Sequence, residues 1–325
     1  MLTWLARRVG YAFLILLGVN LLTFILFFKV NTPDDMARMQ LGAKRVTPEA
    51  ISKWKTERGL DKPLLYAAQE TGLQQFTNTL FYERSLEMFA LRFGSSDDGR
   101  DIAYEIRQRA WPSLALALPT FILGLFAAIW LALLMAFFRG TALDFWSGVI
   151  CIIMMSISGL FYIIGGQFLF AKTLHLVPIS GYADGADSLR FLILPIVIGI
   201  IGGLGGQARW YRTLFLEEIY KDYVRTARAK GLSEVVILVR HVLRNSLIPI
   251  LTGVVVVIPL LFMGSLLSES FFGIPGLGSY TIEAINAQDF NIVRAMVFIG
   301  SALYIVGLML TDIAYTLVDP RIRLS

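Results

Sequence analysis

The chain has 325 residues, of which 56% are hydrophobic and only 16% are charged. Its mean hydropathy of +0.66 is too high for a water-soluble domain, so the composition predicts an integral membrane protein. The net charge of +5 is small, and we expect membrane lipid rather than nucleic acid as a partner. The single cysteine, Cys151, excludes an intramolecular disulfide and a cysteine-based metal cluster.

The first apolar run, Val9 to Phe28, follows Arg7 and Arg8 and is long enough to cross a bilayer. Because basic residues favour the cytoplasmic side of a membrane, we expect the N-terminus to lie in the cytoplasm. Residues 1–29 are thus predicted to form the first transmembrane helix. We expect Asn20, a polar residue in this run, to make a hydrogen bond to another helix.

Residues 30–110 form the only substantial polar region and are predicted to be a periplasmic insertion. Within it, Thr47 and Pro48 are typical of a helix start, and Gly59 is typical of a helix end. Residues 101–109 have the pattern of a short amphipathic helix on the membrane surface.

The remaining residues, 111–325, are predicted to form a core of five helices, which gives six transmembrane helices in an all-α protein. The five runs cover about 111–138, 145–170, 189–206, 248–268 and 292–317, and we expect both termini to be cytoplasmic. Glycines at the end of the fourth span predict close helix packing. They do not predict a nucleotide-binding loop, because no strand precedes them and no Lys-Ser or Lys-Thr pair follows.

The loop 209–247 holds eight Lys and Arg residues between Arg209 and Arg244, whereas residues 269–291 hold none. This asymmetry places the loop in the cytoplasm. We predict a helix from Asp222 to Lys230 that ends at Gly231, where glycine tolerates a left-handed backbone. A second helix, about 233–244, is predicted to lie parallel to the membrane.

The sequence D-Y-V-R-T-A-R-A-K-G-L at 222–232, followed by R-H-V-L-R-N-S-L-I-P at 240–249, resembles a known loop. It is the cytoplasmic loop of permease subunits of ATP-binding-cassette (ABC) importers of the peptide/nickel type. The resemblance continues in G-L-D-K-P at 59–63, L-R-F-G-S-S at 91–96, L-V-P-I-S-G at 176–181, E-S-F-F-G-I-P-G-L-G at 269–278 and D-P-R-I-R at 319–323. It implies the fold of a type I ABC importer transmembrane domain.

The same resemblance implies two functional segments. The first is a coupling loop for an ATPase subunit, although the Glu of the superfamily's E-A-A-x-x-x-G pattern is replaced here by Arg225. We expect Ala227 and Gly231 to give close contact, and Arg225 and Arg228 to give charge. The whole predicted loop site is Asp222, Arg225, Thr226, Ala227, Arg228, Ala229, Lys230 and Gly231. The second segment is a periplasmic turn of Glu269, Phe272, Pro275, Gly276 and Gly278, in which the Glu269 carboxylate accepts backbone hydrogen bonds.

The implied function is the translocation-pathway subunit of a binding-protein-dependent importer, with peptides as the first substrate class and nickel chelates, opines or peptide antibiotics as alternatives. The implied partners are a second homologous permease, two ATPase subunits and a periplasmic solute-binding protein, in the inner membrane of a bacterium. We expect no enzymatic activity, metal or cofactor on this chain. No Walker motif is present, so ATP and Mg²⁺ would bind the partners, and His175 and His241 allow neither an H-E-x-x-H motif nor a catalytic triad.

A self-sufficient secondary transporter or channel is the alternative. It would require intramembrane charges, and Asp312 and Glu269 are the candidates.

Overall fold

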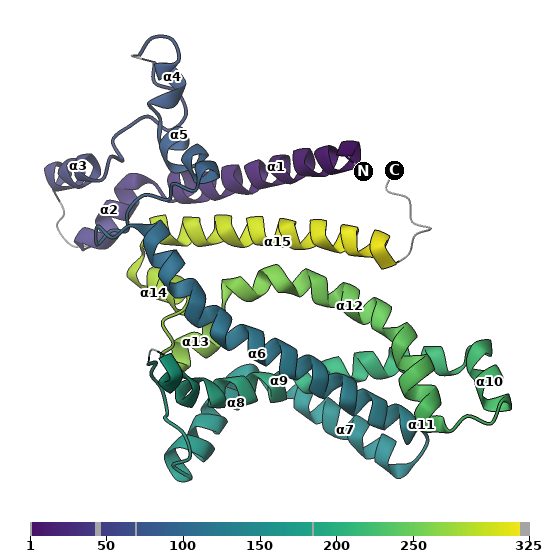
Figure 1. Cartoon of the computed structure of the whole chain (residues 1–325). Helices are drawn as coiled ribbons and strands as arrows, with labels where there is room; N and C mark the ends of the chain where they lie inside the picture. The colour runs from purple at the N-terminus through teal and green to yellow at the C-terminus, as the bar shows by residue number, and fades with distance from the viewer. Residues whose placement is uncertain (1, 43–46, 69, 184, 319–325) are drawn as a thin grey trace. The chain divides into compact units, whose positions relative to one another are not determined.

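The computed structural model describes residues 2–42, 47–68, 70–183 and 185–318, and these residues are almost entirely helical (Figure 1). The one β-contact among them is an isolated antiparallel bridge between Ser95 and Asp101. The chain divides into two compact units. Unit 1 comprises residues 1–108 and 281–305, together with 324–325, and unit 2 comprises 109–280 and 306–323.

Unit 1 contains the first long helix, the insertion and the first part of the last helix. Its elements are α1 (Leu2–Phe24) continued by a π-helical turn (Ile25–Val30), α2 (Pro33–Leu41), α3 (Pro48–Glu57), α4 (Gln74–Thr77), α5 (Leu80–Arg84), a 3-10 turn (Leu86–Ala90), the start of α6 (Ile102–Phe137), the end of α14 (Leu277–Ala287) and the start of α15 (Phe290–Val318). The predicted start of α3 is confirmed, because the Thr47 hydroxyl accepts a hydrogen bond from the Ala50 N–H at 3.3 Å. Gly59 follows the helix end with φ +62°, as predicted.

The core of unit 1 joins α1 to the insertion. Phe24, Phe28, Trp54 and Leu80 are buried together in one apolar cluster. Asn20 is also buried, and its side-chain amide donates to the Ser85 carbonyl at 2.9 Å. The expected hydrogen bond of Asn20 is therefore made to the insertion and not to another long helix.

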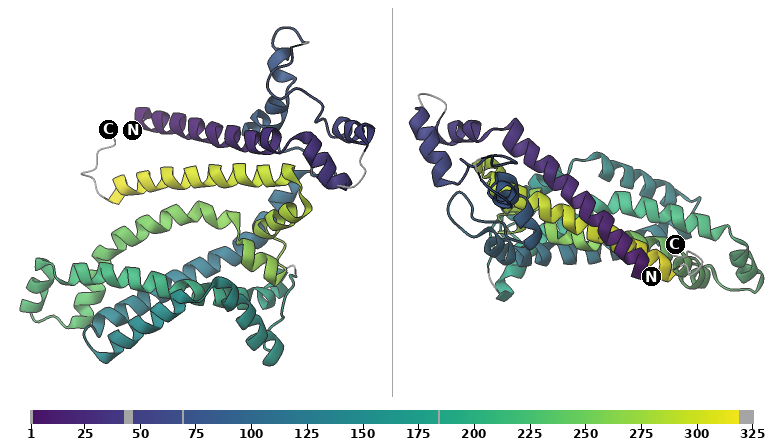
Figure 2. Two further views of the ribbon diagram at one scale, coloured as in Figure 1. Left: turned by 180° about the vertical axis from the view of Figure 1, so that it is seen from behind. Right: turned by 90° about the horizontal axis from the view of Figure 1, so that it is seen from above.

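Unit 2 holds the other long helices. Its elements are α6 (Ile102–Phe137, from residue 109), α7 (Ala142–Ser156), α8 (Gly159–Gly166) with a π-helical turn (Gln167–Thr173), a 3-10 turn (Gly185–Asp187), α9 (Ser188–Ile219), α10 (Asp222–Ala229), α11 (Glu234–Val236) with a π-helical turn (Ile237–Val242), α12 (Leu243–Leu260), a 3-10 turn (Leu261–Met263), α13 (Leu266–Phe272), and parts of α14 (Leu277–Ala287) and α15. In unit 2, α10 lies at one end of α9, far from α13 (Figure 1 and Figure 2).

Five helices in the described part of the chain are long and apolar enough to cross a membrane, and a bent pair makes a sixth. They are 7–30, 102–137, 188–219, 234–263 and 290–313, with 142–156 plus 159–173 as the bent pair. With the bent pair counted as one span, the number matches the six predicted spans. Two boundaries were predicted wrongly. Residues 102–109 form the start of α6 and not a separate surface helix, and the predicted helix at 233–244 continues without a break into the predicted span 248–268.

The third span is not the single helix expected from residues 145–170. It bends by 91° between α7 and α8. Ile157 and Ser158 adopt extended backbone conformations with ψ of 128° and 143°, and Gly159, a weak helix former, follows them. The bend therefore forms at two extended residues and needs no proline.

The helices α7 and α9 pack closely in unit 2. Gly205 permits this approach, because a methyl group there would lie 2.7 Å from the Cys151 carbonyl oxygen. Nearby, the Arg212 guanidinium donates from Nε and Nη2 to the two Asp144 oxygens at 2.8 and 2.7 Å. Close backbone contact and a bidentate ion pair thus hold α9 against α7, and α9 in turn positions the segment that follows it.

Candidate functional site

The short helix α10 ends as the sequence predicts. Lys230 caps it, and Gly231 follows with φ +77°. The Gly231 N–H donates to the Arg228 carbonyl at 2.9 Å, and the Leu232 N–H donates to the Ala227 carbonyl at 3.3 Å. This hydrogen-bond pair is the Schellman arrangement, in which a left-handed residue reverses the chain and satisfies the last carbonyls of a helix. Gly231 therefore sets the direction in which the chain leaves α10.

One face of α10 belongs to the core of its own chain. Val224 and Ala227 are buried with 0% and 5% of their surfaces exposed, and they join the cluster that contains Phe215 and Ile237. Ala227 shares a face with Val224, because residues three apart on a helix lie side by side, and both therefore pack against their own chain. The expected contact of Ala227 with an ATPase stays a prediction. The exposed loop-site residues are Asp222, Arg225, Thr226, Ala229, Lys230 and Gly231.

Arg228 is also committed within the chain. Its Nε donates to a Glu234 carboxylate oxygen at 2.7 Å, and the same carboxylate lies 3.8 Å from Arg139. These contacts tie α10 to the first turn of α11 and to the end of α6. Arg228 therefore holds the loop together. Arg225 has an exposed side chain, and its one ion pair among the described residues is with Asp222 on its own helix, at 3.5 Å.

Tyr223 fixes the entry to α10. Its hydroxyl donates to the Glu218 carboxylate, which also receives Lys221. Burial and the neighbouring Glu218 raise the pKa of Tyr223 to about 12, so the hydroxyl keeps its proton at neutral pH. The end of α9, the entry to α10 and the start of α11 are thus held by side-chain contacts as well as by the backbone.

The second predicted segment is built around Glu269, which is fully buried in unit 2. Its carboxylate accepts from the Ser265 N–H at 3.0 Å, the Gly278 N–H at 2.7 Å and the Ser279 N–H at 3.1 Å. Ser113 of α6 also donates to it, and the Ser113 oxygen accepts from the Leu277 N–H at 2.7 Å. The predicted backbone hydrogen bonds of Glu269 are therefore present.

Electrostatics at Glu269 act in two directions. Burial raises the pKa of the carboxyl above its ordinary value, while the Ser113 hydroxyl and the three backbone donors work against that rise. The donors come from both sides of the turn, before α13 and at the start of α14. One side chain therefore closes the turn by satisfying N–H groups that would otherwise lack a partner at a helix start.

The glycines of this turn make room for the carboxylate. A methyl group at Gly276 would collide with the Glu269 oxygen Oε2 and lie close to Ser113, and one at Gly278 would lie 2.6 Å from the Ser265 carbonyl carbon. Phe272 is buried beside Ile274, whereas Pro275 is exposed. The pattern E-x-x-F-x-x-P-G-L-G thus encodes a buried carboxylate, a core aromatic side chain and two positions without room for a side chain.

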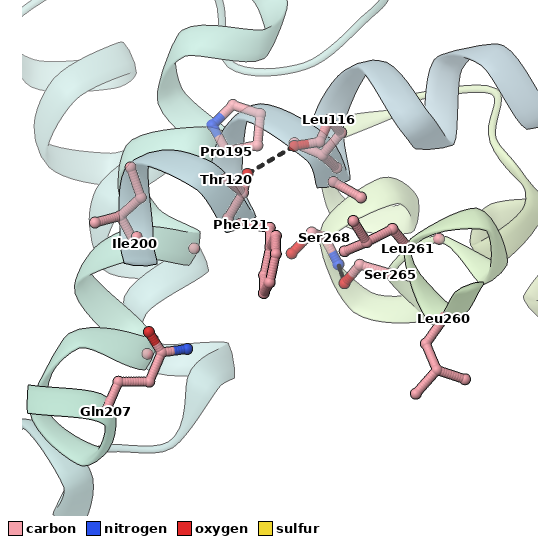
Figure 3. Close-up of a pocket in the computed structure, with 15 residues that line it drawn as sticks. Leu116, Thr120, Phe121, Pro195, Ile200, Gln207, Leu260, Leu261, Ser265 and Ser268 are labelled. Carbon is pink, nitrogen blue, oxygen red and sulfur yellow. Dashed lines mark hydrogen bonds between the residues drawn. The ribbon is translucent and has the colours of Figure 1, made fainter. Parts of the chain in front are cut away.

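A cavity of about 290 Å³ lies between α6, α9 and the end of α12 with α13 (Figure 3). Its polar side chains are Thr120, Gln207, Ser265 and Ser268, and no charged side chain of the described residues lines it. The rest of the lining is apolar or glycine, namely Leu116, Ala117, Phe121, Gly124, Pro195, Gly199, Ile200, Gly203, Leu260, Leu261 and Gly264. Sequence reasoning missed this site, although the glycine-rich end of the fourth span was the available signal.

The D-P-R-I-R segment at 319–323 lies outside the described residues. Among the residues that are described, no cluster of three or more His, Cys, Asp or Glu side chains could hold a metal ion.

Comparison with known proteins gives matches along nearly the whole chain. Residues 128–324 match the family described as binding-protein-dependent transport system inner membrane component, and residues 1–117 match its N-terminal counterpart. A putative peptide transport system permease of Brucella abortus is 33% identical and is covered over 98% of both chains.

Two further relatives carry more specific names. The di/tripeptide transport system permease protein DppB of Pseudomonas aeruginosa is 33% identical over 99% of both chains. The dipeptide transport system permease protein DppB of Escherichia coli is 28% identical over 99% of both chains. The family matches, the extent of these likenesses and the set of apolar helices agree that this multi-pass membrane protein belongs to the inner membrane components of binding-protein-dependent transport systems, the permease subunits of ABC importers.

Proposed function

We propose that this chain is one of two permease subunits of an ATP-driven peptide importer in a bacterial inner membrane. Two ATPase subunits and a periplasmic solute-binding protein complete the assembly, and ATP and Mg²⁺ bind the ATPases. The observation that carries the proposal is the full-length likeness to permeases named for dipeptides and di/tripeptides. A secondary transporter would require intramembrane charges, and Glu269 was one of the two candidates. Its carboxylate already accepts hydrogen bonds from the backbone of the turn, which favours an importer.

The exposed face of α10 is the contact for an ATPase in this proposal. Asp222, Arg225, Ala229 and Lys230 are exposed there, while Val224 and Ala227 anchor the same helix to the core. A short helix with one anchored and one free face can pass a push from outside to α9 and α12, which share its core cluster. The charge on Arg225 and Lys230 gives an acidic groove on a partner something to bind.

The uncharged cavity of Figure 3 is the part of the transport path that this chain supplies in the proposal. Hydroxyl and amide groups of Thr120, Gln207, Ser265 and Ser268 can exchange hydrogen bonds with peptide backbone groups. A lining without charge neither traps nor repels peptides whose side chains differ in charge. This property suits passage of a substrate better than tight retention.

Orientation follows from charge in the proposal. The basic loop 209–247 faces the cytoplasm, and the insertion 30–110 faces the periplasm, where it meets the binding protein. Ser52 is exposed on α3. A cysteine at Ser52, in a variant whose native Cys151 is replaced by serine, is expected to react with an impermeant thiol reagent applied from the periplasmic side. Labelling that occurs only after the inner membrane is broken would reverse the orientation.

The transport activity is tested with the complex purified from native cells on a tagged permease and reconstituted in proteoliposomes. We expect labelled dialanine to accumulate only when ATP and the solute-binding protein are both present. Nickel chelates and opines are added as competitors to test the other substrate classes. Accumulation driven by an ion gradient without ATP would favour a secondary transporter instead.

A further inference from the structure

Arg294, one turn into α15, is buried in unit 1 with 2% of its surface exposed. Its Nη2 atom has no hydrogen-bond partner among the described residues. The guanidinium carbon lies 4.7 Å from the centre of the Phe28 ring, which is a cation–π contact. A cation–π contact supplies no lone pair, so it leaves the Nη2 group without a hydrogen-bond acceptor. A buried cation without a charged partner is destabilising, and a bound anion would compensate its charge.

A cavity of about 260 Å³ lies against Arg294. It is lined by part of the insertion and by the start of α15, all within unit 1: Glu83, Arg84, Glu87, Met88, Arg92, Phe93, Gly94, Asn291 and Arg294. Three arginines thus face two glutamates, and one of the glutamates, Glu83, is already paired with Lys62. The cavity therefore has an excess of positive charge.

The neighbouring arginine adds to this excess. Arg84 donates from Nη2 to the Arg58 carbonyl at 2.6 Å, a contact that fixes its position without neutralising its charge. The positive charge of Arg84 repels the positive charge of Arg294. No ion pair within the described residues joins either guanidinium to a carboxylate. A small anion in the cavity would satisfy Arg294 and reduce the repulsion between the two arginines at once.

We propose that this cavity is a carboxylate-binding site in which Arg294 is the buried cation and Arg84 and Arg92 are the flanking cations. A guanidinium presents parallel N–H groups that match the two oxygens of a carboxylate. The volume is smaller than that of a typical small-molecule pocket, so the site suits one carboxylate-bearing group rather than a whole peptide. Given the proposed function, two sources present this group, the C-terminus of a peptide and an acidic side chain of the solute-binding protein.

The chemistry is tested on the purified full-length chain, without transport, by following thermal unfolding through tryptophan fluorescence. Sodium acetate and N-acetylglycine are compared with sodium chloride and the neutral N-acetylglycinamide at equal ionic strength. We expect the melting temperature to rise with the concentration of the two carboxylates only, because a ligand that binds the folded state stabilises it. In Arg294→Gln, half-saturation should need at least about tenfold more carboxylate, because the buried charge pair is lost.

Two further variants keep the test decisive. Arg92→Gln changes an exposed residue at the cavity and should weaken the response to acetate while folding normally. Arg100→Gln changes an arginine of the insertion that does not line the cavity, and its response should match the wild type. In chloride alone, Arg294→Gln should melt no lower than the wild type, because it removes an uncompensated buried charge. Equal acetate responses in Arg294→Gln and wild type would overturn the proposal, as would stabilisation by phosphate but not by acetate.

The source of the carboxylate is tested in the co-purified complex. If the peptide supplies it, Arg294→Gln should reduce uptake of dialanine but not of dialanine amide. If the binding protein supplies it, the variant should weaken its capture by the permease, and amidation of the binding protein's carboxylates should weaken capture by the wild type to the same extent. A variant with normal uptake and normal capture would remove the functional role. Because the melting experiment requires no transport, its result stands apart from the peptide-import proposal.

Discussion

Gly205 of α9 lies against the backbone of Cys151 in α7, where a methyl group would come within 2.7 Å of the Cys151 carbonyl oxygen and 3.1 Å of Met154 Cβ. A backbone atom cannot rotate away as a side chain can. Gly205→Ala is therefore expected to separate the two helices and to lower the free energy of unfolding by about 1–3 kcal/mol.

The neighbouring glycine is a matched control. Gly206→Ala would place its methyl group 4.0 Å from the flexible end of Met155, which is an ordinary contact. Thermal unfolding of both variants in the same detergent should show a lower melting temperature for Gly205→Ala only. Equal melting temperatures would mean that α7 and α9 adapt more easily than their packing indicates.

Glu269→Gln tests the buried turn. A glutamine amide has one acceptor oxygen and one NH₂ donor, so at least one of the backbone N–H groups of Ser265, Gly278 or Ser279 would face a donor. A buried unsatisfied donor costs about 1–3 kcal/mol. We expect reduced thermal stability and poorer assembly with the partner subunits.

The control for Glu269 is Glu217→Gln, which changes an exposed carboxylate on α9. It should melt and assemble like the wild type. Wild-type assembly and transport in Glu269→Gln would show that the turn tolerates a lost hydrogen bond and that the carboxylate has no functional consequence.

Tyr223 predicts a pH dependence at the loop. The pKa of its hydroxyl is about 12 in the folded protein, whereas a tyrosine in an unfolded chain titrates near pH 10. Between these values the folded state binds more protons, so stability falls as pH rises through the window. The contribution of the Tyr223–Glu218 hydrogen bond is therefore complete below about pH 10 and lost by about pH 12.

The measurement compares the wild type with Tyr223→Phe. The wild type should be more stable by about 0.5–1.5 kcal/mol at pH 8, and the difference should shrink above pH 10. Tyr220→Phe, which changes an exposed tyrosine, should show no such trend. A constant difference from pH 8 to 11.5 would indicate that Tyr223 acts through packing alone.

Local chemistry explains which features the sequence predicted well. The Gly231 cap and the hydrogen bonds of Glu269 depend on a few neighbouring residues whose roles follow from backbone geometry. The six spans follow from the length of the apolar runs. By contrast, the bend after Ser156 lies inside one apolar run. The hydropathy of such a run is the same for a straight helix and for a bent one, so it could not predict the bend.

Features that depend on tertiary packing could not be predicted. Ala227 has a small side chain, which suits both a partner contact and a core position, and its place in the core cluster follows from packing that the sequence does not show. The continuity of α11 into α12 was hidden by Pro249, which lies inside the helix. The cavity of Figure 3 combines residues from helices far apart in the sequence, so the glycine-rich end of the fourth span marks one wall of it and not the whole.

The coupling role of α10 is tested at Gly231. Its φ of +77° strains any β-branched residue, and no atom lies within 4 Å of an added Cβ, so the strain in Gly231→Val comes from the backbone alone. We expect a cost of about 1 kcal/mol or more and a changed exit path from α10. The membrane helices should still insert, because no apolar run is altered.

Two controls separate coupling from strain. Gly140, at the turn between α6 and α7, also has φ +77° and equally open surroundings, so Gly140→Val carries the same backbone strain at a turn outside α10. Gly231→Asn keeps the left-handed conformation that asparagine tolerates. In reconstituted complexes, Gly231→Val should recruit ATPase subunits poorly or lose solute-stimulated ATP hydrolysis, while Gly140→Val and Gly231→Asn should retain most of both. Normal recruitment, stimulation and uptake in Gly231→Val would leave α10 as a basic surface helix without a part in coupling.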